Sequence, residues 1–217
     1  LIKKALHPYA DDLVIVTKVG ARRAEQANWL PAFSAAELTR AVEDNLRNLG
    51  LDVIDVVNLR AMFDTHGPAE GSLKAELETL IKLKERGLIR HIGLSNVTAK
   101  QVADAQAMTT IACVQNLYNI ANRQDETLIH QLAAQGIAYV PFFPLGGFSP
   151  LPSEQLNAVA QELNATPMQV APAWPLQPPP TILLIPGTPS PEHLNQTPAS
   201  GAPPLTPDAV APLHPTH

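Results

Sequence analysis

The sequence predicts an α/β fold built around a parallel sheet, and three observations lead to this class. Short runs rich in β-branched residues alternate with helix-like segments, and several of these segments end at a glycine. The short runs are apolar from end to end, as strands are when helices cover both faces of a parallel sheet. Finally, 217 residues with 45% apolar and 16% charged side chains are enough for a sizeable globular core.

The elements follow one another regularly along the chain. Residues 13–16 form the first predicted strand because Val and Ile dominate them. Ser34 and Glu37 form a capping box, which predicts a helix that runs to Leu49 and ends at Gly50. The same reasoning predicts strands at 54–59, 89–94, 111–115, 137–142 and 182–185, and helices at about 73–86, 99–108, 126–135 and 153–163.

Six strand–helix units in this order suit either a (β/α)₈ barrel, the TIM barrel, or a doubly wound open sheet. No Gly-x-Gly-x-x-Gly turn follows the first strand, which counts against the open sheet that binds dinucleotides. The barrel is therefore the favoured interpretation.

The last third of the chain differs in composition, because 19 of the 22 prolines lie at or after Pro141. Pro172 and Pro175 fall inside what would otherwise be a helix, where each costs about 3 kcal/mol or more. We therefore predict residues 1–197 as a partial barrel with an irregular, Pro-rich end, and residues 198–217 as a disordered tail.

Composition excludes several classes of partner. A net charge of −5 without a Lys/Arg run counts against nucleic acid and membrane surfaces, and no apolar stretch reaches the length of a membrane span. The single cysteine, Cys113, is predicted to be a buried structural thiol, and it favours a reducing, cytoplasmic location. His66, His91 and His130 lack the spacing of metal ligands, so no metal site is predicted, although His66 could border a substrate site.

Polar or aromatic side chains end five of the predicted strands. The strands end Thr17-Lys18, Leu59-Arg60, Ser95-Asn96, Gln115-Asn116 and Phe142-Phe143-Pro144. Any one of these alone suits a helix cap or a rim residue. Strand carboxyl ends meet at one edge of a barrel, where ligands bind, so five such ends favour a site. The Ser, Asn and Gln side chains suit a ligand that carries a carboxamide.

Five segments carry a resemblance to a known family: VIVTKVG, GLIRHIGLSN, VQNLYNIANR, PFFPLGG and LLIPGT with EHL after it. In this order and spacing they resemble the aldo-keto reductase family, over residues 1–197. The resemblance implies a (β/α)₈ barrel that reduces aldehydes and ketones to alcohols by hydride transfer from NADPH.

The resemblance also implies roles for single residues. Lys18 matches the catalytic lysine, whose charge lowers the pKa of a tyrosine that protonates the carbonyl oxygen. Ser95, Asn96 and Gln115 match the residues that hold the nicotinamide carboxamide, and Phe142 matches the ring that stacks on it. The other cofactor positions, which contact the pyrophosphate and the adenosine 2′-phosphate, match Phe143, Pro144, Leu145, Gly146, Pro186, Gly187, Thr188, Ser190 and His193.

The sequence departs from the family pattern in three ways. The Asp-x-Ala-x-x-Tyr-Gly motif, which supplies the catalytic tyrosine and aspartate, is absent. The family places it just before the position of residue 1, so we expect about two βα units to be missing. Arg60 replaces the usual histidine and can donate to a carbonyl oxygen without shuttling protons. Gln196-Thr197 replaces Glu-Asn, which weakens the adenosine end of the cofactor site.

Two functions stay open on these grounds. One is an NADPH-dependent reductase of small-molecule carbonyls, with catalysis impaired in this chain. The other is a non-catalytic barrel remnant that at most binds a nucleotide or a partner.

Overall fold

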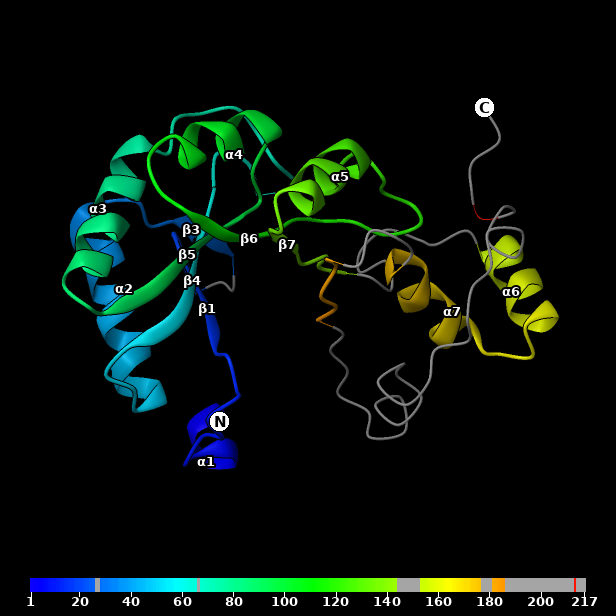
Figure 1. Cartoon of the computed structure of the whole chain (residues 1–217), viewed down its shortest axis with the longest axis horizontal. Helices are drawn as coiled ribbons and strands as arrows, with labels where there is room; N and C mark the ends of the chain where they lie inside the picture. Colours follow the sequence, from blue (N-terminus) through cyan, green and yellow to red (C-terminus); the bar gives the residue numbers. More distant parts are fainter. Residues whose placement is uncertain (26–27, 66, 144–152, 177–180, 186–212, 214–217) are drawn as a thin grey trace. The chain divides into compact units, whose positions relative to one another are not determined.

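The computed structural model describes residues 1–25, 28–65, 67–143, 153–176, 181–185 and 213, and the chain divides into two compact units, Leu1–Gln115 and Asn116–His217 (Figure 1). The first unit contains α1 (Ile2–Leu6), β1 (Val16–Val19), β2 (Ala21–Arg23), β3 (Trp29–Pro31), α2 (Ala35–Leu49), β4 (Ile54–Arg60), α3 (Lys74–Glu85), β5 (Ile89–Ser95), α4 (Ala99–Gln106) and β6 (Ile111–Gln115). The second unit contains α5 (Glu126–Ala134), β7 (Ala138–Tyr139), α6 (Ser153–Glu162), α7 (Pro167–Ala173) and the 3₁₀ helix η1 (Trp174–Leu176).

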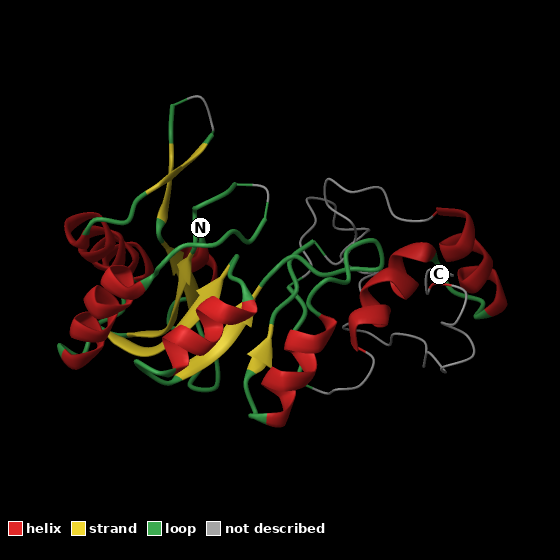
Figure 2. Ribbon diagram, turned by 90° about the horizontal axis from the view of Figure 1, so that it is seen from above, coloured by secondary structure: helices red, strands yellow, loops and turns green. Residues whose placement is uncertain are grey.

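A parallel sheet forms the centre of the first unit, with β1, β4, β5 and β6 as neighbours in that order. Helix α2 packs against α3 and β1, and α3 packs against β5, which Figure 2 shows as two adjacent helices beside the strands. Leu38 of α2, Leu80 of α3 and Ile92 of β5 are fully buried between the layers. The prediction of an α/β fold with a parallel sheet is confirmed.

Three strand boundaries differ from the prediction. Strand β1 starts at Val16 rather than at residue 13, so Lys18 lies inside the strand and not after it. The strand expected at 137–142 is reduced to β7, because Pro141 has no N–H for a ladder. The prediction of a strand at 182–185 is wrong: among the described residues there, only Ile182 pairs with another strand residue, through one isolated bridge to Tyr139.

Strands β2 and β3 form an antiparallel hairpin that the sequence did not predict. It follows β1 directly through Gly20, whose φ of +100° lies in the region that glycine adopts readily. A Cβ at this position would lie 2.5 Å from the carbonyl oxygen of Arg60, so only glycine allows the chain to pass the end of β4.

Helix α7 forms in the segment where the prolines predicted that a helix would be disrupted. The helix opens with a capping box between Thr166 and Gln169 and includes Pro172. It then changes at Trp174 to the 3₁₀ turn η1, which contains Pro175. Burial of Val170 and Trp174 accompanies this short helix and offsets the hydrogen bond that proline cannot make.

The predicted tail at 198–217 lies outside the described residues except for Leu213, which is buried. Among the helices that the structure describes, none combines the length and the apolar character that crossing a bilayer requires.

Candidate functional site

Four of the predicted site residues lie together in the first unit. The sheet register pairs Arg60 of β4 with Ser95 of β5, and Ser95 with Gln115 of β6, so these three form one row at the carboxyl ends of the strands. On β1, Lys18 pairs with Asn58 of β4. Asn58 precedes Arg60 by two residues, so both point to the same face of the sheet.

The side chain of Lys18 extends from its position beside Asn58 to the row that contains Gln115. Its ammonium Nζ donates to Oε1 of Gln115 at 2.5 Å. The lysine as a residue is exposed on β1, but partial desolvation of its ammonium lowers its pKa, and the charge of Arg60 lowers that pKa further. The carboxamide of Gln115 is therefore turned with its oxygen toward a cation.

Asn58 is a member of the site that sequence reasoning missed. It is 1% exposed, and its Nδ2 donates to Gln115 Oε1 at 3.2 Å. The thiol of Cys113 donates to Asn58 Oδ1 at 3.2 Å, and burial raises the pKa of this thiol to about 11. A signal was present, because Asn58 is the one uncharged polar residue in the apolar run of β4. The prediction that Cys113 is buried is confirmed.

Arg60 meets the unpredicted hairpin at the edge of the site. Its guanidinium lies 5.1 Å from the ring centre of Trp29, and the guanidinium of Arg23 lies 5.0 Å from the same ring. Desolvation lowers the pKa of Arg60, which is half-buried. Two cations therefore lie against one indole ring beside the carboxyl ends of the strands.

The side chain of Asn96 forms hydrogen bonds to the loop after β4. Its Nδ2 lies within hydrogen-bond distance of the carbonyl oxygens of Ala61, Asp64 and Gly67, at 2.9, 3.2 and 3.2 Å. The backbone of Asn96 has a φ of 59°, a conformation that asparagine tolerates better than most residues. Its backbone N–H donates to the carbonyl of Gln115, which ties the end of β5 to β6.

Two predicted aromatic positions lie in the second unit. The N–H of Phe142 donates to the carbonyl of Asn116 at 2.9 Å, and the Phe143 carbonyl accepts from Asn119 Nδ2 at 3.0 Å. The rings of Phe142 and Phe143 meet edge to face. The other predicted positions, Pro144, Leu145, Gly146, Pro186, Gly187, Thr188, Ser190 and His193, lie outside the described residues, as does His66.

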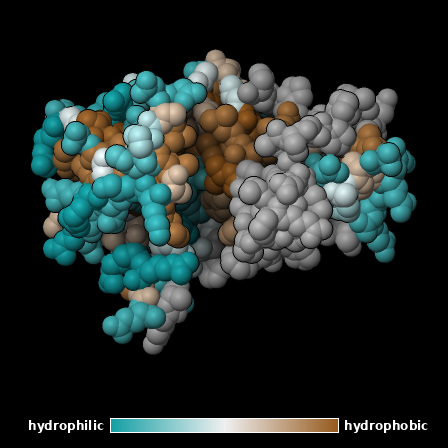
Figure 3. Space-filling model, turned by 90° about the horizontal axis from the view of Figure 1, so that it is seen from below, coloured by the Kyte–Doolittle hydropathy of each residue, from teal (hydrophilic) through white to brown (hydrophobic). Residues whose placement is uncertain are grey.

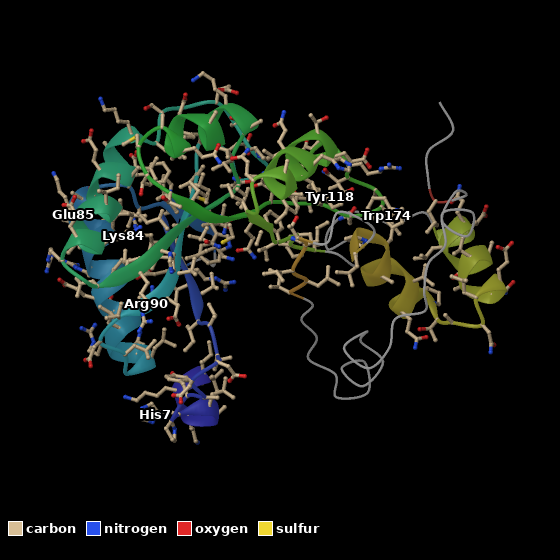
Figure 4. All side chains as sticks on the ribbon, viewed as in Figure 1. His7, Lys84, Glu85, Arg90, Tyr118 and Trp174 are labelled. Carbon is tan, nitrogen blue, oxygen red and sulfur yellow. The ribbon has the colours of Figure 1, made fainter. Side chains whose placement is uncertain are left out.

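The three tyrosines of the chain have structural contacts. Tyr9 donates to the Leu49 carbonyl at 2.8 Å. Tyr139 donates to Asp125 at 2.8 Å, and burial raises its pKa. Tyr118 stacks on Trp174 with ring centres 5.4 Å apart, and burial raises its pKa too. Figure 4 labels both residues in the second unit. Neither Tyr118 nor Tyr139 is thus suited to act as an acid near neutral pH.

No three His, Cys, Asp or Glu side chains come together as metal ligands within the described part of the chain.

Comparison with known proteins identifies relatives of the chain. The model of the aldo/keto reductase family matches residues 1–214. Pyridoxine 4-dehydrogenase of Escherichia coli K12 is 64% identical over 201 residues, which are 92% of this chain and 70% of that protein. An uncharacterized oxidoreductase of Schizosaccharomyces pombe is 35% identical over 197 residues, 90% of this chain and 62% of that protein.

Solved structures show the same fold. The thermostable aldo-keto reductase Tm1743 superposes with a TM-score of 0.79 at 26% identity, covering 98% of this chain and 74% of its own. An aldo/keto reductase of Klebsiella pneumoniae, solved with NADP and acetate, gives 0.76 at 24% identity, covering 100% and 76%. The α/β fold and parallel sheet match those of solved aldo-keto reductases, and the chain belongs to the aldo/keto reductase family of oxidoreductases.

Proposed function

We propose that this oxidoreductase transfers a hydride between NADP(H) and a small carbonyl or alcohol. The hydrogen bond from the Lys18 ammonium to Gln115 carries the proposal, because it joins a cation to a carboxamide at the carboxyl ends of the strands. Carbonyl reduction builds negative charge on oxygen, and a fixed cation stabilises that charge. When bound, NADP(H) supplies or accepts the hydride.

Lys18 and Arg60 are the residues that we propose to act on the substrate oxygen. Both are cations in the same part of the first unit, and desolvation together with the charge of Arg60 lowers the pKa of Lys18. Arg60 can donate hydrogen bonds to the oxygen, but its guanidinium stays protonated near neutral pH and does not serve as the acid. A separate proton donor is therefore needed for fast turnover.

The polar residues of the first unit fit the nicotinamide end of the cofactor by their chemistry. Ser95 and Gln115 bring a hydroxyl and a carboxamide to adjacent strand ends, and both are buried. We assign the carboxamide of the cofactor to Ser95, Asn96 and Gln115, and its ring face to Phe142. Phe143 and the predicted positions outside the described residues are assigned to the phosphates, in agreement with the family pattern.

Pyridoxal and pyridoxine are the first substrates to test. The supporting observation is the 64% identity to a pyridoxine 4-dehydrogenase. By that analogy the reacting group is the aldehyde or alcohol carbon on position 4 of a pyridine ring.

A second candidate function is favoured by one observation. The sequence contains no Asp-x-Ala-x-x-Tyr-Gly motif, and the hydroxyls of Tyr9, Tyr118 and Tyr139 are engaged elsewhere. With these three hydroxyls engaged, the second candidate is a protein that binds the nucleotide without turnover.

The test compares this chain with the same chain joined, ahead of Leu1, to a segment that carries the family tyrosine motif. Fluorescence titration is expected to show NADPH binding by both. Pyridoxal reduction, followed as NADPH oxidation, is expected to be about 10²–10⁴-fold faster in the joined chain because general-acid help is restored. The matched control replaces the joined tyrosine with phenylalanine.

Two variants of the joined chain separate the roles. Lys18→Met is expected to abolish turnover and keep NADPH affinity, whereas Gln115→Leu is expected to weaken NADPH binding. NADPH binding with equally slow turnover in both chains would support the second candidate. Absence of NADPH binding would rule out both.

A further inference from the structure

Asn58 of β4 forms hydrogen bonds to two side chains of β6. The thiol of Cys113 donates to Asn58 Oδ1 at 3.2 Å, and Asn58 Nδ2 donates to Gln115 Oε1 at 3.2 Å. Cys113 precedes Gln115 by two residues on the same strand, so both side chains lie on one face of the sheet. One buried carboxamide therefore connects the core of the sheet to the strand end where Gln115 lies.

Gly93 of β5 leaves the space in which these groups meet. It pairs with Asn58 in the sheet register, and its strand lies between the strands that carry Asn58 and Cys113. A side chain on residue 93 would overlap Asn58 Oδ1 and come within 2.7 Å of the Cys113 sulfur. The contact across the middle strand therefore depends on a residue without a side chain.

The sequence of donors and acceptors fixes the orientation of both carboxamides. Burial raises the pKa of the Cys113 thiol to about 11, so the thiol keeps its proton near neutral pH and is the donor. Because Asn58 Oδ1 accepts from the thiol, its Nδ2 faces Gln115, which presents its oxygen. Lys18 agrees with this orientation, since its ammonium donates to the same Oε1 at 2.5 Å and cannot accept.

A buried network of this kind rigidifies its members. Asn58 is 1% exposed, and burying a carboxamide costs free energy unless its polar atoms find partners. When every member has a partner, the network selects one arrangement of its side chains. The member at the strand end is Gln115, so the arrangement that is selected includes the orientation of a side chain in the site.

We propose that Asn58, itself oriented by Cys113, is a positioning residue that holds the Gln115 carboxamide ready for the nicotinamide end of NADP(H). The proposal rests on the proposed function, which assigns the nicotinamide carboxamide to Ser95, Asn96 and Gln115. In this role Asn58 acts through Gln115 rather than by contact with the cofactor. Loss of its hydrogen bond frees Gln115 to turn and weakens binding at the nicotinamide end alone.

The test compares two ligands of the 217-residue chain by calorimetric titration. They are NADPH and 2′-phospho-ADP-ribose, which keeps the adenosine and pyrophosphate parts but lacks the nicotinamide. Asn58→Leu is expected to weaken NADPH binding about 2–10-fold, the range for one hydrogen bond, and to leave 2′-phospho-ADP-ribose binding unchanged. General damage to the fold would weaken both ligands alike. Asn48→Leu, at an exposed position of α2, is the matched control and is expected to change neither affinity.

A double variant tests whether Asn58 acts through Gln115. Gln115→Leu alone is expected to weaken NADPH binding. Adding Asn58→Leu to it is expected to weaken binding no further, because the group to be positioned is gone. The proposal would be overturned by a further loss in the double variant, or by an Asn58→Leu chain with an unchanged ratio of the two affinities.

Cys113 provides a comparison that does not depend on the folding of Asn58→Leu. Cys113→Ser keeps a hydrogen-bond donor, whereas Cys113→Ala removes it. Only the alanine variant is expected to lower the affinity for NADPH relative to 2′-phospho-ADP-ribose, and equal ratios in the two variants would overturn the proposal. NADPH binding with unchanged ratios would reject this proposal and keep the proposed function, whereas absence of NADPH binding by the unmodified chain would reject both.

Discussion

At the scale of single residues, Cys113 shows how burial controls a reactive group. Its thiol donates to Asn58, and burial raises its pKa to about 11. At pH 8 the folded chain is therefore expected to react with iodoacetamide about 100-fold more slowly than the same chain in denaturant, because only the thiolate attacks. The folded rate is expected to rise tenfold per pH unit until about pH 11.

Mass spectrometry of timed samples measures this alkylation, and the chain in denaturant is the control. A folded rate at pH 8 equal to the denatured rate would show that Cys113 is accessible and ionised. It would thereby contradict the network around Asn58.

At the scale of elements, two buried amides hold the loop between β4 and α3. Asn96 serves its first part, and Gln101 Nε2 donates to the carbonyls of Ala69 and Gly71 at 3.0 and 2.9 Å. Gln101 also closes the capping box with Thr98, which starts α4. The start of one helix therefore fixes the loop that precedes another.

Gln101→Ala removes both loop contacts and half of the capping box. We expect it to lower the free energy of unfolding by about 1–3 kcal/mol, since each net hydrogen bond contributes about 1. Chymotrypsin is expected to cut faster after Phe63, which is 39% exposed in the same loop. Lys100→Ala, on the exposed side of α4, is the control, and equal cleavage of the two variants would refute the anchoring role.

At the scale of the whole molecule, the edge of the sheet dominates the behaviour that we expect in solution. Among the described strands, β1 pairs only with β4, so its other edge has free backbone groups. Val14 and Val16 beside it are 63% and 50% exposed. Hydrophobic residues, drawn in brown, are visible at the surface among hydrophilic ones in Figure 3. An open edge with apolar side chains is a template for self-association.

Val16→Lys is expected to reduce self-association of the 217-residue chain, because a charge on an edge strand opposes pairing with a second copy. Light scattering across a concentration series measures the effect. Exposed Leu176, on η1 in the second unit, offers the control Leu176→Lys, which adds the same charge away from the edge. An equal gain in both variants would show that net charge, and not the β1 edge, sets the association.

The sequence predicted the part of the site that depends on strand order alone. Carboxyl ends of parallel strands align, so Arg60, Ser95 and Gln115 could be expected in one row before any contact was known. The fold class followed in the same way from repeated strand and helix patterns. Their roles toward cofactor and substrate remain proposals.

The contacts of Arg60, Ser95 and Gln115 could not be predicted from the sequence. They depend on the register between neighbouring strands and on the β2–β3 hairpin, which has no clear sequence pattern. The register shifts between Ile92 and Leu94, which decides which β6 side chains meet Asn58. The β2–β3 hairpin has no β-branched residue, and Trp29 is its only residue of a type enriched in strands, which is too weak a signal to predict the hairpin. Both features depend on tertiary structure.

Gly93 affects the order in which substitutions at residues 58 and 93 can be tolerated. A Cβ there would overlap Oδ1 of Asn58 and lie 2.7 Å from the sulfur of Cys113, so alanine is not accommodated while both neighbours keep their size. Asn58→Gly would remove the first obstacle, after which Gly93→Ala meets less resistance. The effects of the two substitutions are therefore not additive. An evolutionary path that enlarges residue 93 therefore meets less resistance in sequences that have already shortened residue 58 than in those that have not.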